Sequence, residues 1–296
     1  MRLVSTASYY RRASDQKSPL EDGCFMNERL GFFGVLDGVS AAYSPSNPPL
    51  RYPRSSFTGG QAAVSAACVV GMSLSERRPV KSSAALMNEK VLKIHKCVGK
   101  DSAVDDVGGA GFALCQADED GIEFLVGADC GVFYLDKNGP HFFSGFDEAA
   151  QKVEEEDEAN FKRHLEEQGS MGKAWDAYFS AYRMKRLTYI NKQVEGGFAS
   201  LNGDPALERC WTYRRVSSNE RPGLVLLMTD GALPPAKTVT SRRKELERDL
   251  SRLLGGLSGD WPQTIFKWRD AGMTSADNPH IDGWPEATMV RLDFSF

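Results

Sequence analysis

The chain has 296 residues, of which 41% are hydrophobic and 26% charged, and a formal net charge of −4. This is the composition of a soluble globular protein, and the length suits one large domain or two small ones. The weak negative charge gives no electrostatic reason to expect a nucleic acid or an anionic membrane as a partner. We find no signal-peptide pattern and no apolar segment long enough to span a membrane, so membrane association is not expected.

The cysteines and histidines do not suggest a metal site or a disulfide framework. No C-x-x-C pair occurs, and the four histidines lie far apart. We therefore expect reduced thiols in a cytoplasmic protein, several of them buried as small hydrophobic residues. The six cysteines are Cys24, Cys68, Cys97, Cys115, Cys130 and Cys210.

The first part of the chain is predicted to be β-rich and then helical. Two apolar runs, 23–27 and 31–37, flank a short connection and predict a β-hairpin. The segment 44–60 is rich in Pro, Ser and Gly and is predicted to be a loop. Two helices are predicted after it, an Ala-rich one from Gln61 and a second one after Pro79.

Strand patterns return in the middle of the chain, and further helices follow. The successive expectations are strands over 109–118, 121–129 and 131–139, a charge-dense helix over 147–168, a further helix to about 192, loop and a short strand over 195–216, a buried strand over 223–229, an amphipathic helix over 241–254 and a strand over 287–296. Pairs of strands thus alternate with pairs of helices. This order predicts antiparallel sheets covered by helices rather than a parallel β-α-β sheet.

The predicted hairpin brings acidic residues together at its open end. With a turn centred on Arg29, Glu21 would face Asp37, and Asp22 would lie beside them. Like charges at this distance resist ionisation unless a cation lies between them. Hard divalent cations such as Mg²⁺ or Mn²⁺ bind clustered carboxylates together with a backbone carbonyl, which Gly38 leaves accessible.

Two further acidic residues occupy similar positions. Asp230 follows the predicted buried strand as Asp37 follows its own, and Asp129 lies between two predicted strands. A single Asp-Gly pair is equally well explained as a turn. Several acidic strand ends from separate regions, without a matching set of His or Cys, favour a metal site.

The order of these motifs resembles that of the metal-dependent serine/threonine protein phosphatases, the PPM or type 2C family. The matching segments cover the chain from about residue 17 to 292 and are "LEDGCF", "FFGVLDGVS", "GGAGFAL", "VGADCGVFYL", "VLLMTDGAL" and "EATMVRL". The resemblance implies an α+β fold, a four-layer α-β-β-α sandwich of two antiparallel sheets flanked by helix pairs. It also implies one domain over 1–296, with a variable helical insertion around 147–195. The charge-dense helix over 147–168 is either a solvated face or a substrate-selecting flap.

The resemblance further implies a site for two Mn²⁺ or Mg²⁺ ions. Asp37 would bridge both ions, and the Gly38 carbonyl would complete one of them. Glu21 and Asp230 would hold the other ion, and Asp22 would orient water bound to metal.

Two more positions acquire roles through the resemblance. Asp129 matches an aspartate associated with a third, weaker metal in some members. Lys17 occupies the place of an arginine that grips the substrate phosphate, although an ammonium lacks the two-pronged fork of a guanidinium.

The chain departs from the family pattern at two other positions. Val39 stands where many members have a histidine. Pro285 stands where the final motif has an aspartate ligand, so Glu286 or Asp282 would have to replace it. The implied activity is hydrolysis of phosphoserine and phosphothreonine in protein substrates by a water that two metals activate.

Two alternatives remain at this stage. A phosphatase-fold regulatory or binding protein with an impaired metal site is favoured by Pro285. A von Willebrand type A module would share "VLLMTDG", but it needs a D-x-S-x-S motif after its first strand, and "DGVSA" at 37–41 does not provide one.

Overall fold

Two five-stranded sheets form the centre of the protein, and all neighbouring strands in them are antiparallel. The computed structural model describes residues 1–12, 20–52, 55–102, 104–233, 243–255, 260–272 and 286–296. One sheet has the order β1–β10–β9–β6–β7, and the other has the order β2–β3–β4–β5–β8. The strands are β1 Arg2–Arg11, β2 Gly23–Asn27, β3 Phe32–Val39, β4 Gly109–Ala117, β5 Gly121–Gly127, β6 Gly131–Asp136, β7 Gly139–Ser144, β8 Thr212–Ser217, β9 Leu224–Met228 and β10 Ala287–Ser295.

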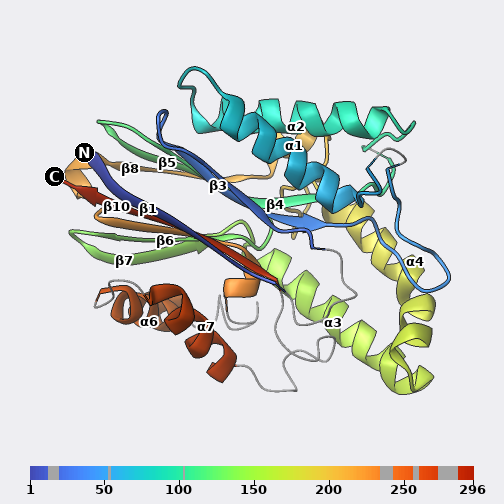
Figure 1. Cartoon of the computed structure of the whole chain (residues 1–296). Coiled ribbons are helices and arrows are strands. Elements are labelled where there is room, and N and C mark those ends of the chain that lie inside the picture. The colour runs from blue at the N-terminus through green and yellow to red at the C-terminus, as the bar shows by residue number, and fades with distance from the viewer. Residues whose placement is uncertain (13–19, 53–54, 103, 234–242, 256–259, 273–285) are drawn as a thin grey trace.

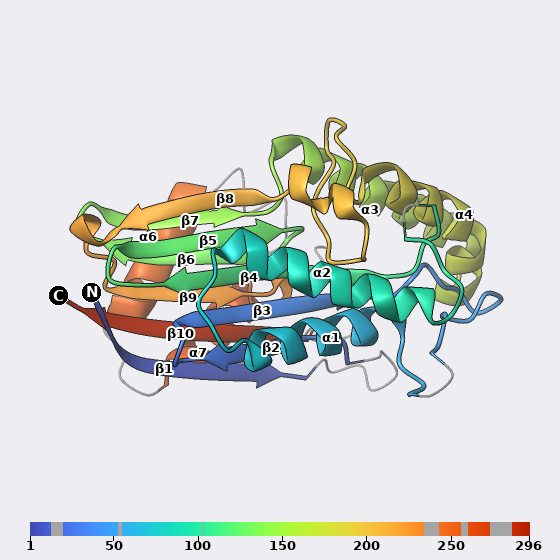
Figure 2. The same ribbon diagram turned by 90° about the horizontal axis from the view of Figure 1, so that it is seen from above.

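Helix pairs cover the outer faces of both sheets. Helices α1 and α2 lie over the β2–β3–β4–β5–β8 sheet, and α6 and α7 lie over the other sheet (Figures 1 and 2). The predicted four-layer α-β-β-α sandwich is therefore confirmed. The helices are α1 Gly59–Ser73, α2 Val80–Lys96, α3 Glu148–Gln168, α4 Met171–Tyr189, α6 Arg243–Gly255 and α7 Trp261–Gly272, with short 3-10 turns η1 Pro205–Arg209, η2 Ser218–Glu220 and η3 Asp230–Ala232.

Alternation along β3 divides its side chains between two cores. Phe32 and Leu36 pack under α1 and α2, whereas Phe33 and Val35 pack between the two sheets. Successive side chains of a strand point to opposite faces. Asp37, two residues beyond Val35, therefore continues the inter-sheet face at the end of the strand.

Helix α1 packs closely on its sheet, as its Ala-rich sequence predicts. Its N-terminus carries a capping box between Thr58 and Gln61. A Cβ added to Gly71 would lie 2.6 Å from the ring of Phe25 on β2. Small residues on this face let the helix backbone approach the sheet.

The predicted β2–β3 hairpin is present, but its register differs by one residue from the expectation. Phe25 pairs with Gly34, whereas a turn centred on Arg29 would have paired it with Phe33. The turn contains four residues, 28–31, and Gly31 adopts a φ of +66° at its end. The same register, continued beyond β2, sets Glu21 opposite Gly38 instead of Asp37.

Helices α3 and α4 form an antiparallel pair at the end of the sandwich away from the two chain termini (Figure 1). The pair packs around Phe161, Ala174 and Tyr178. It confirms the helical character predicted for 147–192. No helix in the described part of the chain is both long and apolar enough to cross a membrane.

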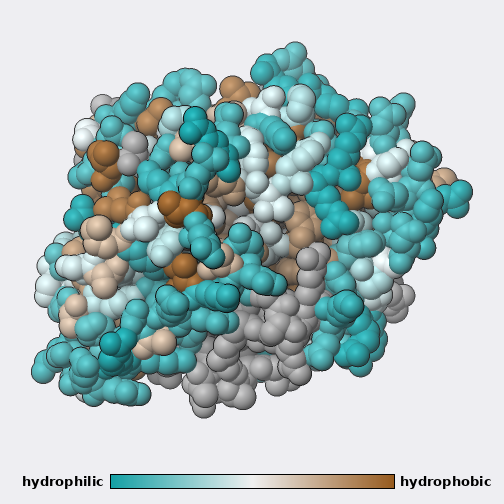
Figure 3. Space-filling view, turned by 180° about the vertical axis from the view of Figure 1, so that it is seen from behind, coloured by the Kyte–Doolittle hydropathy of each residue, from teal (hydrophilic) through white to brown (hydrophobic). Residues whose placement is uncertain are grey.

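The surface on the side opposite to that of Figure 1 is largely hydrophilic. Hydrophobic side chains on it lie in small groups separated by hydrophilic ones (Figure 3). Apolar residues exposed in this scattered way are ordinary on a soluble protein.

Candidate metal centre

The strand connections place the predicted acidic residues at one end of the sandwich. Asp37 lies near the end of β3, Asp129 between β5 and β6, and Asp230 just after β9. Glu21 and Glu286 lie just before β2 and β10. Antiparallel pairing makes the end of one strand coincide with the beginning of its neighbour, so these positions from distant parts of the chain meet.

Asp37 lies at the centre of the cluster. Burial raises the pKa of its carboxyl group, and the nearby charges of Asp230, Asp22 and Asp129 raise it further. The Asp37 and Asp230 carboxyl groups also hydrogen-bond to each other. Two carboxylates share such a bond only if one holds a proton, and a divalent cation can take the place of that proton.

Asp22 is held by a threonine from the other sheet. The Thr229 hydroxyl donates a hydrogen bond of 2.8 Å to Asp22 Oδ2 and accepts one of 2.9 Å from the Thr288 backbone N–H. Burial raises the pKa of Asp22, and the charge of Glu286 adds to the effect. Thr229 is fully buried, so this contact fixes the carboxylate between the two sheets.

Glu21 accepts hydrogen bonds from three protein donors. These are the Ser40 backbone N–H at 3.1 Å, the Ser40 hydroxyl and the Thr58 hydroxyl. A Cβ at Gly38 would lie 2.5 Å from the Glu21 carbonyl oxygen, so the glycine is needed for this close approach. The predicted roles of Glu21 and the Gly38 carbonyl as metal ligands stay predictions.

Glu286 reaches the cluster from the start of β10. Its carboxylate accepts a hydrogen bond of 2.8 Å from the Glu21 backbone N–H and one of 2.6 Å from the Tyr10 hydroxyl. Of the two residues expected to replace the family's final aspartate, Glu286 therefore lies at the site. Asp282 and Lys17 lie outside the described residues.

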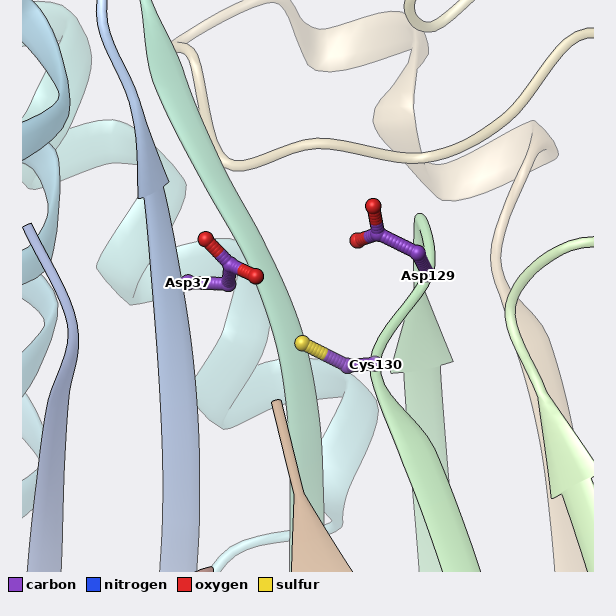
Figure 4. Close-up of side chains that lie close together, drawn as sticks. All are labelled: Asp37, Asp129 and Cys130. Atoms are coloured by element: carbon purple, nitrogen blue, oxygen red, sulfur yellow. The ribbon is translucent and has the colours of Figure 1, made fainter. Parts of the chain in front are cut away.

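Asp129 faces Asp37 from the β5–β6 connection. Burial raises the pKa of Asp129 to about 8, and the charges of Asp230 and Glu154 contribute. Carboxylate oxygens of Asp37 and Asp129 and the Cys130 sulfur all lie within 4.8 Å of one another (Figure 4).

Sequence reasoning missed two residues near this cluster. Cys130 directly follows a predicted ligand, and that adjacency was the only available signal. Glu154 lies on α3, and only the packing of α3 against the end of the sandwich brings its charge near Asp129.

The atoms that could bind a metal in this cluster suit hard divalent cations. They are mainly carboxylate oxygens, which Mg²⁺ and Mn²⁺ prefer. The hydrogen bond between Asp37 and Asp230 and the raised pKa of Asp37 indicate an excess of negative charge that a cation would relieve.

Comparisons with known proteins find this fold in bacterial phosphatases. PppA, a key regulatory component of T6SS in Pseudomonas aeruginosa, aligns with a TM-score of 0.52 and 14% identity over 98% of this chain and 96% of that one. The catalytic domain of the serine/threonine protein phosphatase PstP, in complex with 2 manganese ions, aligns with a TM-score of 0.53 and 12% identity over 98% and 97%. The serine/threonine phosphatase Stp1 from Staphylococcus aureus aligns with a TM-score of 0.54 and 12% identity over 100% and 96%.

The sequence comparisons add no closer relationship. No family model and no curated protein sequence matches the chain. The structural matches extend over almost the whole length of this chain and of each phosphatase. The chain therefore has the fold of the metal-dependent serine/threonine protein phosphatases.

Proposed function

We propose that the protein is a metal-dependent phosphatase that releases phosphate from phosphoserine and phosphothreonine in protein substrates. The observation that supports this most is the meeting of Asp22, Asp37, Asp129, Asp230 and Glu286 at one end of the inter-sheet core. Gathering so much like charge at one place destabilises a protein unless a cation lies between the charges.

In this proposal the carboxylates hold two Mn²⁺ or Mg²⁺ ions, and Asp129 serves a third. Asp37 would help to hold both ions, Glu21 and Asp230 would serve as ligands with the Gly38 carbonyl, and Glu286 would take the place of the family's final aspartate. Bound divalent cations neutralise phosphoryl oxygens and activate water for in-line attack on phosphorus.

The chain's own residues orient this chemistry. Asp22, fixed by Thr229, would accept a hydrogen bond from the attacking water and keep it in line with the phosphorus. Lys17 is proposed to bind the substrate phosphate as a single positive charge. We place this activity in the cytoplasm, because all six cysteines are free thiols.

The test is phosphate release from phosphoserine and phosphothreonine peptides with Mn²⁺ and with a chelator. We expect activity that requires the metal and that falls at least about a thousandfold in Asp37→Asn and Asp230→Asn. Glu119→Gln, an exposed acid in the β4–β5 turn, is the matched control and should retain full activity. Metal-independent activity, or full activity in Asp37→Asn, would refute the proposal.

The alternative is a regulatory protein that keeps the fold with an impaired site. It is favoured by the two hydrogen bonds that already engage the Glu286 carboxylate, since a carboxylate held by Tyr10 and the Glu21 N–H is less available as a ligand. Binding of Mn²⁺, followed by calorimetry, without hydrolysis of any phosphopeptide would identify this case.

A further inference from the structure

Cys130 contributes a thiol to the acidic cluster. It is the last residue before β6, its side chain is fully buried, and it belongs to the inter-sheet core. Its sulfur faces the carboxyl groups of Asp37 and Asp129 (Figure 4). A Cβ added to Gly111 on β4 would lie 3.4 Å from Asp129 Oδ1 and 3.5 Å from Cys130 Sγ, so both groups border the same small space.

The Cys130 thiol has no hydrogen-bond partner among the described residues. Two other thiols do have partners, since Cys68 donates to the Cys24 carbonyl at 3.5 Å and Cys210 donates to the Ala206 carbonyl at 3.8 Å. Among the described residues the buried Cys115 thiol also has no partner, so the feature that distinguishes Cys130 is that its buried sulfur faces two carboxyl groups.

Cys115 provides a built-in comparison. It is also fully buried and lies in the same inter-sheet core. Cys130 lies with the carboxyl groups of Asp37 and Asp129 in a group of ligand atoms within 4.8 Å of one another, and no such group in the described part of the chain includes Cys115. The two thiols therefore differ in their carboxylate neighbours and not in their exposure.

We propose that Cys130 is a sulfur ligand and that, with Asp37 and Asp129, it forms a mixed oxygen–sulfur site for a thiophilic divalent cation such as Zn²⁺ or Cd²⁺. This inference rests on the proposed function, because it extends the same metal centre. Ligands on opposite sides of one ion, each about 2.3–2.5 Å away, are about 4.6–5.0 Å apart. The three donor atoms, within 4.8 Å of one another, fit around a single ion.

The thiol would make the site discriminate between cations. A metal–sulfur bond forms as the thiol proton leaves to solvent, so binding of the ion releases protons. Zn²⁺ and Cd²⁺ bind thiolate strongly enough to drive this exchange, whereas the hard Mg²⁺ ion uses only the carboxylates. Since Asp37 serves both kinds of ion, thiophilic cations should displace Mn²⁺ from it and inhibit hydrolysis.

The test is a Cd²⁺ titration of the full chain after metal removal, followed by the ultraviolet charge-transfer absorption of a cadmium–thiolate bond. We expect one equivalent of Cd²⁺ to produce the band, with loss of the band and about a tenfold or greater weakening of Cd²⁺ binding in Cys130→Ser. Cys115→Ser, the matched control, should keep both. Circular dichroism of each variant verifies that it is folded, and Cys130→Ala replaces Cys130→Ser if the latter is not.

The outcomes separate this inference from the proposed function. An unchanged band and Cd²⁺ affinity in the Cys130 variant would overturn the inference, whatever the phosphatase activity. A band that depends on Cys130 supports the inference even in a protein that hydrolyses no phosphopeptide, because the absorption reports the bond itself.

Discussion

The Glu286 carboxylate accepts a hydrogen bond of 2.8 Å from the backbone N–H of Glu21, a residue 265 positions away in the chain. The bond joins the start of β10, in one sheet, to the segment before β2, in the other. It brings the charge of Glu286 close enough to raise the pKa of both Glu21 and Asp22. One carboxylate thus connects the two sheets at the mouth of the proposed metal centre.

Two substitutions of Glu286 distinguish a role as a metal ligand from a role that only connects the two sheets. Glu286→Gln keeps an acceptor for the Glu21 N–H but removes the charge, so we expect nearly unchanged stability and about 10–100-fold weaker Mn²⁺ binding by calorimetry. Glu286→Ala also leaves the N–H without its partner and should cost about 1–3 kcal/mol in the free energy of unfolding. Equal Mn²⁺ affinity in the wild type and Glu286→Gln would exclude Glu286 as a ligand.

Asp37 is expected to lower the stability of the metal-free protein. Asp37→Asn removes a carboxyl group whose charged form is disfavoured by burial and by the charges of Asp230, Asp22 and Asp129. In chelator we therefore expect the variant to be more stable by about 1 kcal/mol or more, which raises the melting temperature by about 2–4 °C for a chain of this size. With Mn²⁺ the order should reverse, because only the wild type gains binding energy.

Differential scanning fluorimetry with and without Mn²⁺ measures both halves of this prediction. Glu119→Gln should follow the wild type in both conditions. A lower melting temperature for Asp37→Asn in chelator would show that the carboxyl group stabilises the metal-free fold and would contradict the prediction.

Much of the fold could be predicted because its central strands are buried on both faces. Both apolar runs that precede an Asp-Gly pair are strands in the structure: β3 includes its pair at Asp37, and β9 ends two residues before Asp230. β1 was not delimited in advance, because it is an edge strand with no fully buried residue and hence a weak hydrophobic pattern. The hairpin register was wrong by one residue, since the positive φ of Gly31 lengthens the turn.

The acidic residues of the candidate site could be predicted where a strand ends on them, as at Asp37. The position of Cys130 beside the acidic residues could not be predicted, because it depends on how the inter-sheet core packs. Glu154 also could not, because no local pattern reports that α3 lies against the β5–β6 connection. Contacts of this kind arise from tertiary packing and have no period in the sequence.

Thr229 is expected to act through Asp22. Thr229→Val preserves shape but removes the donor to Asp22 and the acceptor for the Thr288 N–H. We expect about 1–3 kcal/mol of destabilisation and about a tenfold or greater fall in kcat, with Mn²⁺ affinity changed much less. Thr229→Ser keeps the hydroxyl and should restore kcat, which a purely steric role of the methyl group would not allow.

A buried ion pair secures α4 to the body of the protein. Arg186 Nε donates to Asp106 Oδ1 at 2.9 Å, and Asp106 Oδ2 accepts from the Ala42 N–H at 2.7 Å. The two side chains are 6% and 5% exposed, so removing one partner leaves a buried charge. Arg186→Met should therefore cost about 3–5 kcal/mol in urea unfolding.

The control for this pair is an exposed one. Lys93 and Glu89 lie 2.7 Å apart on α2 with side chains 66% and 54% exposed, and Lys93→Met should change stability far less than Arg186→Met does. The double variant Arg186→Met/Asp106→Asn should recover part of the loss. A loss at Arg186 as small as that at Lys93 would show that the pair is not desolvated.

His95 is predicted to make the protein less stable in weak acid. Its ring is fully buried and hydrogen-bonded through Nδ1 to the Tyr52 hydroxyl, and burial lowers the pKa of His95 to about 4. The unfolded chain binds a proton near pH 6.5, whereas the folded chain does not bind it until about pH 4. Stability from the neutral ring is thus complete above pH 6.5 and is lost as the pH falls towards 4, by up to about 3 kcal/mol.

The carboxylates of the acidic cluster respond in the opposite direction, because their raised pKa values favour the folded state as the pH falls. The contribution of His95 is therefore obtained from the difference between wild type and His95→Gln in urea unfolding at pH 7.5 and pH 5. We expect the difference in unfolding free energy to shrink by about 2 kcal/mol at the lower pH, since the glutamine binds no proton. A difference for His95→Gln that stays constant would mean that the ring is protonated equally in the folded and unfolded chains.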